Sequence, residues 1–501
     1  MEASFWIKQQ NKQVSYPALE HDVSCNIAII GAGLTGLSTA YYLNRASKDI
    51  MILEADQVGF GASGRNTGKI TFQHGAVYHK LMEKYDKVYA SRYYQAQVDA
   101  MRSIEAIIQE HHIDCDYQKR DALIYTKDVT KVYELQDEYQ TYLDLGIEAT
   151  YLKSDEYSFP IEAGILVHDQ ASYNPYSYCL GLSDVVHKQG TEIFEHSPVS
   201  DVKKEAETYV LRVNDHVVHA NKVIFACQFP FMDYMHFYFA RMIAIQETLC
   251  YTSLHQKFTK DMMVSIDQPM HSANLTKDTL IMSGNKHRSG TQTSGELEAY
   301  MQSLYQTYPI EKIEHTWSNE DYLTFDELPL VGKLAKDNDD LFFASGFNAW
   351  GNTTSNMAAK ILCAYLMDHY SIYAMLTSPQ RASFLTIPFL KENMKTALEF
   401  IKSRMKKEDI DYPLKKHAKR IDLDGHTYGM YRDEQDELYI VDITCPHMGC
   451  ILEFNTIDKT WDCPCHGSRF SYQGDIVKGP STHGLHAYGD DFNKVDPHVI
   501  K

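Results

Sequence analysis

The sequence lacks any run of about 18 apolar residues, and its first residues show no basic segment followed by an apolar one. The first absence leaves no candidate membrane span, and the second leaves no signal peptide. Positive charge is also scarce, because 48 Lys and Arg face 67 Asp and Glu, which gives a formal net charge of −19. An acidic surface repels nucleic acid and anionic membranes. We therefore expect a cytoplasmic protein with neither nucleic acid nor a membrane as its partner.

Cysteine is sparse over most of the chain, and a chain of 501 residues exceeds what one hydrophobic core can hold. We therefore expect two or three domains. Isolated cysteines among apolar neighbours are usually small buried side chains with free thiols in the cytoplasm. Six follow that pattern, while four gather within the last sixty residues and indicate a site there. The isolated six are Cys25, Cys115, Cys179, Cys227, Cys250 and Cys363.

A dinucleotide-binding pattern opens the first domain. The apolar run Ile27–Ile30 is followed by Gly31-x-Gly33-x-x-Gly36 and then by a helical pattern. In this pattern the glycines allow a tight turn, close approach of backbone N–H groups to a pyrophosphate, and close packing of helix on strand. A second strand ends at Glu54, whose carboxylate can bind ribose hydroxyls. A purely structural glycine turn is the alternative, which the ordered set of elements disfavours. The candidate contacts at the helix start also include Leu34 and Thr35.

The sequence has no second GxGxxG for a nicotinamide nucleotide, and instead continues as GFGASGRNTGKI over Gly59–Ile70. Here it resembles the D-amino-acid oxidase and glycine oxidase superfamily of flavoproteins, in which this segment wraps the flavin end of FAD. The resemblance recurs over residues 171–205, 221–229, 324–334 and 344–362. It implies FAD contacts for Ala62, Ser63, Arg65, Asn66 and Val199.

A glycine-rich turn between a strand and a helix, FASGFNAWGNTTS, forms the last of these segments. Such a turn can aim backbone N–H groups and the positive end of a helix at a flavin carbonyl. The resembled family usually has a shorter glycine–histidine turn there, so this sequence departs from its pattern. The candidate flavin contacts in the turn are Gly346, Phe347, Asn348, Gly351, Asn352 and Thr353.

The cysteine-rich end contains Cys445-x-His447 and, further on, Cys463-x-x-His466. Two Cys and two His fit either a zinc site or a Rieske [2Fe–2S] cluster. Zinc fingers usually place both Cys before both His, whereas here each stretch supplies one of each. The flanking residues, CPHMGC and CPCHGSRF, resemble the two ligand loops of the Rieske family. Gln473–Leu485 resembles the proline loop that covers the cluster in that family.

The Rieske resemblance implies further roles for neighbouring residues. Cys450 and Cys465 occupy the positions that form a loop-to-loop disulfide in cytochrome bc type Rieske proteins, and we expect that bond. Ser468 matches the position whose hydroxyl bonds a cluster sulfide. Phe470 stands where a tyrosine often follows. A hydrogen bond missing near the cluster should lower its reduction potential, so we expect a value below that of high-potential respiratory Rieske proteins.

The predicted fold class is an α/β Rossmann-type FAD domain with an interleaved α+β substrate domain and a small all-β C-terminal Rieske domain. The flavoprotein domain is expected over residues 1–388, a helical and basic linker over 389–420, and the Rieske domain over 421–501. Within the first domain, the FAD part is expected at about 24–75, 171–235 and 321–370. The substrate part is expected at about 76–170 and 236–320.

The two cofactors together predict an activity. A flavin accepts two electrons as a hydride, while a Rieske cluster carries one at a time. The family resemblance implies oxidation of a C–N bond in an amino acid or amine. The cluster, with its histidines expected at the tip of the domain, implies an unidentified external electron acceptor. We therefore expect an FAD-dependent dehydrogenase; a non-catalytic electron-transfer or redox-sensing protein is the alternative.

Candidate catalytic residues are few. Arg241 could pair a substrate carboxylate bidentately, and a surface ion pair is the alternative. His74 and His79 follow the flavin segment and could polarise the ring, but each could equally be a structural histidine. Their spacing also suits the two-His-one-carboxylate iron site of Rieske oxygenases. That interpretation is disfavoured, because no well-placed carboxylate accompanies them.

Overall fold

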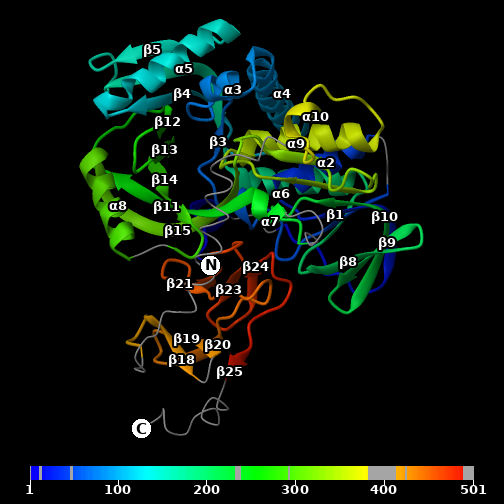
Figure 1. The fold of residues 1–501 in the computed structure, drawn as a ribbon. Helices are drawn as coiled ribbons and strands as arrows, with labels where there is room; N and C mark the ends of the chain where they lie inside the picture. The colour runs from blue at the N-terminus through cyan, green and yellow to red at the C-terminus, as the bar shows by residue number, and fades with distance from the viewer. Residues whose placement is uncertain are drawn as a thin grey trace.

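The computed structural model describes residues 2–10, 14–45, 49–231, 238–291, 294–381, 413–423 and 426–488. Residues 2–381 form a large body, and residues 413–488 form a C-terminal lobe beneath it in Figure 1. Residues 389–412 of the predicted linker lie outside the described residues. Within the described ranges, no helix is long and apolar enough to cross a membrane.

The first sheet of the body has a parallel centre. Its order is β16-β17-β10-β1-β2-β7, and a hairpin of β8 and β9 extends from β10. Both faces are covered, which explains the nearly continuous apolar run of β1. Ile27 and Ile29 face one core cluster and Ala28 and Ile30 face another. The strands are β1 (Val23–Ile30), β2 (Ile50–Leu53), β7 (Glu192–Phe194), β8 (Val199–Glu205), β9 (Thr208–Val213), β10 (His216–Phe225), β16 (Leu330–Lys333) and β17 (Leu341–Ser345).

Helices from distant parts of the chain share the core cluster that contains Ile27 and Ile29. They bury regularly spaced apolar side chains, such as Ala96, Ala100 and Ile104 of α4. The helices of this layer are α2 (Leu34–Leu43), α4 (Lys87–His111), α6 (Pro175–Lys188) and α9 (Gly351–Leu366). The short helices are α1 (Phe5–Lys8), α7 (Tyr238–Arg241) and α10 (Ala374–Thr377).

The second sheet is mostly antiparallel, in the order β15-β11-β14-β13-β12-β4-β6-β3, with β5 paired to β6. Its strands alternate along the chain with those of the first sheet, so the two halves of the body interleave. The strands are β3 (Lys69–Ile70), β4 (Gln118–Thr126), β5 (Thr150–Lys153), β6 (Ala163–Ser172), β11 (Met242–Leu254), β12 (Met262–Ser265), β13 (His271–Thr276), β14 (Thr279–Arg288) and β15 (Ile310–Thr324). The helices α3 (Tyr78–Lys84), α5 (Val132–Leu145) and α8 (Ser294–Thr307) accompany them.

The C-terminal lobe consists of two four-stranded antiparallel sheets. The sheet of β21 to β24 lies nearer the body, and the sheet of β18, β19, β20 and β25 lies at the far end (Figure 1). A small core around Ile443, Trp461 and Phe470 holds the lobe together. The strands are β18 (Ala418–Leu423), β19 (His426–Arg432), β20 (Leu438–Asp442), β21 (Glu453–Asn455), β22 (Thr460–Asp462), β23 (Arg469–Ser471), β24 (Ile476–Lys478) and β25 (Ala487–Tyr488).

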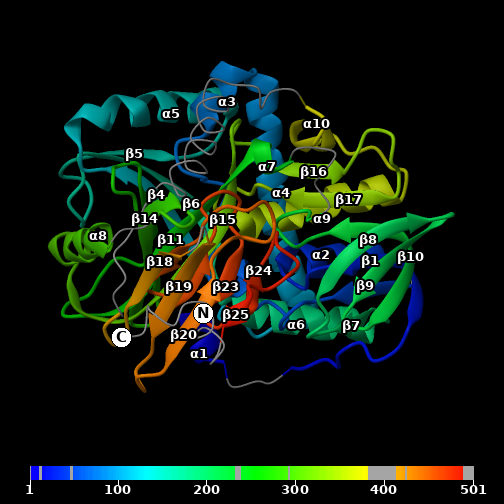
Figure 2. The same ribbon diagram turned by 60° about the horizontal axis from the view of Figure 1, so that its bottom comes forward.

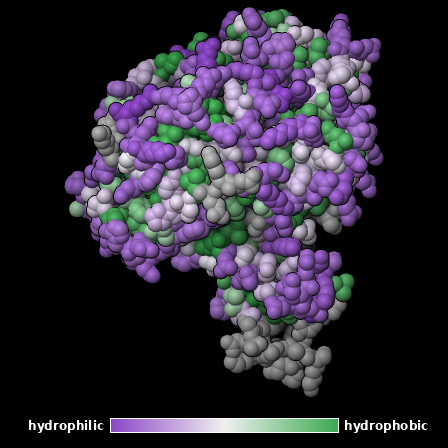
Figure 3. Space-filling view, turned by 180° about the vertical axis from the view of Figure 1, so that it is seen from behind, coloured by the Kyte–Doolittle hydropathy of each residue, from purple (hydrophilic) through white to green (hydrophobic). Residues whose placement is uncertain are grey.

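The N-terminal end of the chain lies at the junction of body and lobe in both Figure 1 and Figure 2. There the backbone N–H of Glu2 donates to Asp458 of the lobe at 3.1 Å. The face in Figure 3 is mainly hydrophilic, and the lobe projects from the larger body. The two parts therefore meet over a limited region, to which the first residues of the chain also contribute.

Candidate functional site

The glycine turn between β1 and α2 has the geometry of a dinucleotide cradle. Gly31 has φ +109°, and a Cβ there would lie 2.8 Å from the carbonyl oxygen of Ala226. A Cβ at Gly36 would lie 2.0 Å from the carbonyl oxygen of Gly31, so the strand and helix could not pack as they do. Gly33 precedes α2 and places no capping side chain on it. The N–H of Leu34, the first residue of α2, is bonded by the Ser63 hydroxyl, and the positive end of the helix faces the glycine turn where a pyrophosphate would bind.

Glu54 lies directly after β2 with its carboxylate at this turn. It accepts hydrogen bonds from the backbone N–H of Ala32 at 2.7 Å and of Asp56 at 3.0 Å. Burial raises the pKa of Glu54, and the two backbone donors oppose that rise. The predicted ribose acid therefore lies beside the predicted pyrophosphate cradle.

Hydrogen bonds to several other segments hold the segment that resembles the flavin-wrapping motif. The Ser63 hydroxyl accepts from the backbone N–H of Leu34 at 3.0 Å. The Asn66 amide donates to the carbonyl of Ser63 at 2.7 Å, and its oxygen accepts from Asn352 at 3.0 Å. Ala62 begins a short 3₁₀ turn here. Asn66 and Asn352 thus join the first and last predicted flavin segments to each other.

Arg65 has a different environment from its neighbours. Its side chain is buried and donates to the backbone carbonyls of Ser318 at 3.1 Å and Glu2 at 2.7 Å. It also lies 3.6 Å from the carboxylate of Asp458 in the C-terminal lobe. The guanidinium predicted to contact FAD is therefore directed at the junction with the lobe.

The glycine-rich turn after β17 leads into α9 through residues with positive φ. A Cβ at Gly346, which has φ +68°, would lie 2.4 Å from a methyl group of Thr324. The Asn348 amide oxygen accepts from the backbone N–H of Thr324 at 2.9 Å. Asp321 accepts from the backbone N–H of Ala349 at 2.6 Å, and burial raises its pKa to about 6.

The start of α9 has no capping side chain from its N-cap residue Trp350, so its positive end is open. Gly351 begins the helix, and Phe347 packs against the first core cluster. The Thr353 hydroxyl lies 3.3 Å from the carbonyl of Thr71 and 3.0 Å from His74. The uncapped start of α9, the positive end of α2 at the first glycine turn, and glycine turns that exclude Cβ atoms together fit a bound FAD. Val199 begins β8 and pairs with Val213 of the hairpin on the first sheet.

His74 is a fully bonded, buried histidine. Its Nδ1 lies 2.7 Å from the Tyr93 hydroxyl and its Nε2 lies 2.9 Å from the carbonyl of Thr71. Its ring stacks on Trp350 with centroids 4.7 Å apart. Burial lowers the pKa of His74 to about 3, so the ring is neutral at pH 7. These contacts favour the structural interpretation of His74 over a catalytic one.

The other two weak candidates have defined partners as well. Arg241 donates to the carbonyl of Pro379 at 2.8 Å and lies over the Tyr238 ring. His79 lies in the first turn of α3, and its backbone N–H donates to Glu138 at 2.7 Å. Within the described ranges, the one group of three side chains close enough to hold a metal is Cys450, Cys463 and Cys465. No two-His-one-carboxylate group is found in that part of the chain.

Sequence reasoning missed Lys69, which lies in β3 just after the flavin-type segment. Its ammonium group is buried and donates to the hydroxyls of Ser272 and Thr67. Burial lowers the pKa of Lys69 to about 7; Glu247 acts against this change and Lys286 adds to it. The sequence signal that could have indicated this buried lysine is its position between Gly68 and the apolar Ile70.

Two loops of the lobe carry the candidate cluster ligands and share one local geometry. We call residues 445–450 the first cluster loop and residues 463–468 the second cluster loop. In each, the carbonyl of the leading cysteine accepts from the N–H of a glycine four residues later, at 2.8 Å for Gly449 and 3.0 Å for Gly467. Both glycines have positive φ, 75° and 81°. The two loops are thus paired copies of one tight turn.

The four predicted ligands converge between these loops. The rings of His447 and His466 lie 5.1 Å apart at 90°. A hydrogen bond from the Cys463 thiol lowers the pKa of Cys445, which shows that the two sulfurs are adjacent. The buried Nδ1 atom of His447 has no hydrogen-bond partner within the described ranges. Two sulfurs and two imidazole nitrogens facing one space fit a Rieske cluster.

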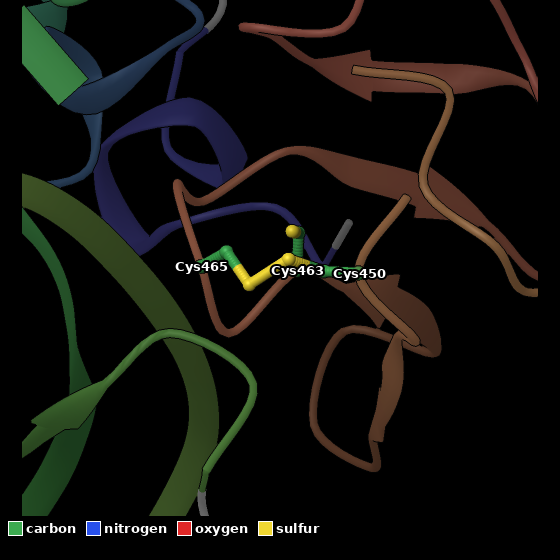
Figure 4. Close-up of side chains that lie close together, drawn as sticks. All are labelled: Cys450, Cys463 and Cys465. Carbon is green, nitrogen blue, oxygen red and sulfur yellow. A yellow bond between two sulfur atoms is a disulfide. The ribbon is translucent and has the colours of Figure 1, made fainter. Parts of the chain in front are cut away.

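Cys450 and Cys465 are joined as a disulfide across the loops, beside Cys463 (Figure 4). The bond uses two of the three clustered sulfurs, so that group is not a separate metal site. Ser468 is buried, and its hydroxyl accepts from the backbone N–H of Ser481 at 3.0 Å. Phe470 is buried in the core of the lobe.

Comparison with known proteins agrees with both sites. Residues 26–365 match the family model described as FAD dependent oxidoreductase. The chain belongs to that family. Residues 404–489 match the Rieske [2Fe-2S] domain, so the chain joins a flavoprotein to a C-terminal Rieske domain. The family and the domain imply FAD and a [2Fe–2S] cluster as cofactors, which disfavours the zinc alternative.

One relative, a protein named as a Rieske 2Fe-2S iron-sulfur protein, YhfW, of Bacillus subtilis (strain 168), is 31% identical over 95% of this chain and 96% of its own. A second, gamma-glutamylputrescine oxidoreductase of Escherichia coli (strain K12), is 23% identical over 73% of this chain and 88% of its own. Glycine oxidase from Geobacillus kaustophilus has a similar fold, with a TM-score of 0.61, 14% identity and coverage of 72% of this chain and 99% of its own. The predicted family and fold class are confirmed.

Proposed function

We propose that this FAD-dependent oxidoreductase is a dehydrogenase that oxidises a C–N bond of an amine or amino acid and delivers the electrons through its Rieske domain to an external acceptor. Each substrate would give up two electrons and two protons to become an imine, which water converts to a carbonyl compound and an amine. An external one-electron acceptor would be reduced twice. The supporting observation is that the second cluster loop contacts β15 of the body, where the Tyr322 hydroxyl donates to the carbonyl of His466 at 3.1 Å.

The chain's own residues divide between two sites. The turn at Gly31 and Gly33, the carboxylate of Glu54 and the turn at Gly346 would hold FAD. Cys445 and Cys463 would bind one iron of the cluster, and His447 and His466 the other. When bound, FAD supplies hydride acceptance and the cluster supplies single-electron transfer.

The disulfide between Cys450 and Cys465 is part of this proposal. It would tie the two cluster loops together and persist even in a reducing cytoplasm. Alkylation of the holoprotein without reductant, followed by intact-mass measurement, tests it. Protection of both cysteines is expected, and labelling of both would refute the bond.

An amine is the favoured substrate because a relative that covers most of the flavoprotein part is named for gamma-glutamylputrescine. Near the predicted flavin segment, Glu247 influences the buried Lys69 electrostatically. A carboxylate in this position could attract a cationic amine. The carboxylate partner expected of Arg241 has less support, because that side chain already bonds the carbonyl of Pro379.

The experiment is an oxygen-free panel of amines, N-methylated amines and amino acids, tested on the holoprotein with an artificial one-electron acceptor. At least one compound should bleach the flavin absorbance and reduce the acceptor, with a carbonyl product. If no compound bleaches the flavin while a reduced protein donor does so rapidly, the non-catalytic electron-transfer alternative replaces the proposal.

A further inference from the structure

The second cluster loop is seated on the large body. Beside the contact between Tyr322 and His466, Arg288 of β14 donates to the carbonyl of Pro464 at 2.7 Å. A Cβ at Gly467 would lie 2.6 Å from the Cβ of Ala244 in β11. A Cβ at Gly290 would lie 2.7 Å from the carbonyl oxygen of Asp462. Each of these two glycines allows an approach between the loop segment and the body that a Cβ atom would prevent.

Buried charges hold the same junction. Arg469 of the lobe is 1% exposed and bonds Asp458 at 2.8 Å and Asp462 at 3.0 Å. It also donates to the Ser318 hydroxyl of the body at 3.2 Å. Buried charges destabilise a protein unless they are paired and hydrogen-bonded. Arg469 has part of its hydrogen bonding from the body, so its burial favours the docked arrangement of the lobe.

The pairs that cross the junction are complementary. Arg65 of the body approaches Asp458 of the lobe, and Lys478 of the lobe lies 2.6 Å from Glu320 of the body. Gln246 of β11 donates to Asp462 at 2.7 Å and accepts from Asn455 at 3.0 Å. Both signs of charge alternate across the contact, which fixes a single orientation of the lobe.

Tyr322 connects the two candidate cofactor sites. Its backbone carbonyl accepts from the N–H of Asn348, in the glycine-rich turn, at 3.3 Å. Its hydroxyl donates to the carbonyl of His466. The ring is 1% exposed, with the ring of Phe229 at 5.4 Å and the ammonium group of Lys478 also at 5.4 Å. One residue therefore spans the distance from the predicted flavin turn to a predicted cluster ligand.

The two histidines differ in their surroundings. His466 is 7% exposed and covered by the body, whereas Met448, next to His447, is 47% exposed. His447 itself is partly exposed. The first cluster loop thus borders solvent while the second borders the body.

We propose that the lobe is docked on the body as a fixed unit, with the second cluster loop as the entrance for electrons, Tyr322 as its positioning residue and the first cluster loop as the exit. The inference rests on the proposed function and adds the path of the electrons and the fixed position of the lobe. Two one-electron transfers follow this route for each substrate oxidised, and the external one-electron acceptor removes both electrons.

The experiment follows one electron inside the holoprotein. A laser flash with a photoreductant reduces the flavin without oxygen, and flavin and cluster absorbances report the electron's passage. In the wild-type protein the rate should not depend on protein concentration or on added glycerol. Because a larger side chain in a filled space forces the neighbours apart, Ala244→Leu should slow the transfer about tenfold. Tyr322→Phe, which loses one hydrogen bond, should slow it about fivefold.

Matched controls separate docking from general damage. Ala244→Ser adds little volume at the same position. Tyr308→Phe removes another buried hydroxyl, bonded to Tyr125 at 2.6 Å. Both should transfer electrons at the wild-type rate. Amide hydrogen exchange of residues 462–469 gives a readout independent of electron transfer. It should rise in Ala244→Leu and stay unchanged in Ala244→Ser.

The outcomes distinguish failure of the proposed function from failure of the fixed docking. If the wild-type flavin is reduced and the cluster never accepts the electron, the proposed function fails and this inference fails with it. If the wild-type cluster is reduced but the rate falls as glycerol is added, or Ala244→Leu changes neither rate nor exchange, the fixed docking is refuted while the function stands.

Discussion

The two cluster loops have nearly the same local structure and very different surroundings. Each forms a turn from a cysteine to a glycine four residues on, and each contributes one partner to the disulfide. The second contacts the large body through Tyr322 and Arg288, whereas the first borders solvent at Met448. The difference indicates that ligand geometry is set within each loop, and in the proposed route what packs against a loop decides whether electrons enter or leave there.

The largest effect is expected from removing a cluster ligand, since both loops contribute ligands to the same cluster. Cys463→Ser takes away one predicted thiolate ligand, so the cluster should be lost while the flavin absorbance remains. Iron content and the electron paramagnetic resonance (EPR) signal of the reduced protein measure this. Cys227→Ser, at a free thiol outside the lobe, should keep the full signal. A full signal in Cys463→Ser would contradict the ligand assignment.

The disulfide variants test whether the loops act as a pair. Cys450 and Cys465 are separated by 15 residues, and a link of this span contributes about 3 kcal/mol in the chain-entropy model. Cys450→Ser and Cys465→Ser should therefore lose similar stability in thermal unfolding without reductant. A loss in one variant alone would mean that packing of that loop, not the bond, carries the effect.

Arg65→Met tests the contribution of the large body to the junction with the lobe. It removes the charged partner of Asp458 across the junction, while the Glu2 N–H and Arg469 still bond that carboxylate. The cost should be about 1–2 kcal/mol in denaturant unfolding. Lys188→Met, at an exposed ion pair with Asp184, is the matched control and should change stability by less than about 0.5 kcal/mol. Equal effects from both would refute a buried cross-junction role for Arg65.

Changes at the end of the second cluster loop and just after it should shift the cluster's reduction potential without removing the cluster. Ser468→Ala deletes a hydroxyl that can bond the cluster, so the potential should fall. Phe470→Tyr restores the hydroxyl common in the family, and the potential should rise. Redox titration followed by EPR measures both. A wild-type potential near the top of the range of roughly −150 to +300 mV would contradict the expected low value.

The smallest effect on the cluster loops is expected from Lys69→Met, because Lys69 lies in the second sheet of the body and not in the lobe. Its folded-state pKa of about 7 is depressed from 10.5, so its contribution to stability is present above pH 10.5 and is lost as pH falls towards 7. Wild-type protein should therefore gain stability relative to Lys69→Met as pH rises through this window. Parallel unfolding curves of the two proteins across it would contradict the depressed pKa.

Much of the fold and site could be predicted from sequence because the signals are local. The glycines at 31 and 36 are required by backbone contacts with Ala226, directly after β10, and with Gly31, while a Cβ at Gly33 would meet the Ser63 side chain. The cysteines and histidines of each cluster loop likewise lie on one turn. Their order along the chain was enough to indicate both cofactors.

The rest depends on contacts between segments far apart in the sequence. Arg65 lies in a flavin-type motif, yet its side chain meets Asp458, nearly 400 positions later. The histidines were expected at the tip of the lobe, and that tip is the end that contacts Tyr322. Neither Asp458 nor Tyr322 leaves a periodic or motif signal in the sequence, because the first is a single residue in the turn between β21 and β22 and the second a single residue of β15.

The most direct test of the account is EPR spectroscopy of the purified protein, air-oxidised and then reduced with dithionite, together with iron, sulfide and zinc analysis and a visible spectrum. We predict a Rieske signal on reduction at two irons per chain, alongside a flavin spectrum. Zinc without such a signal would contradict the account, because the C-terminal lobe would then be a structural metal domain that carries no electrons.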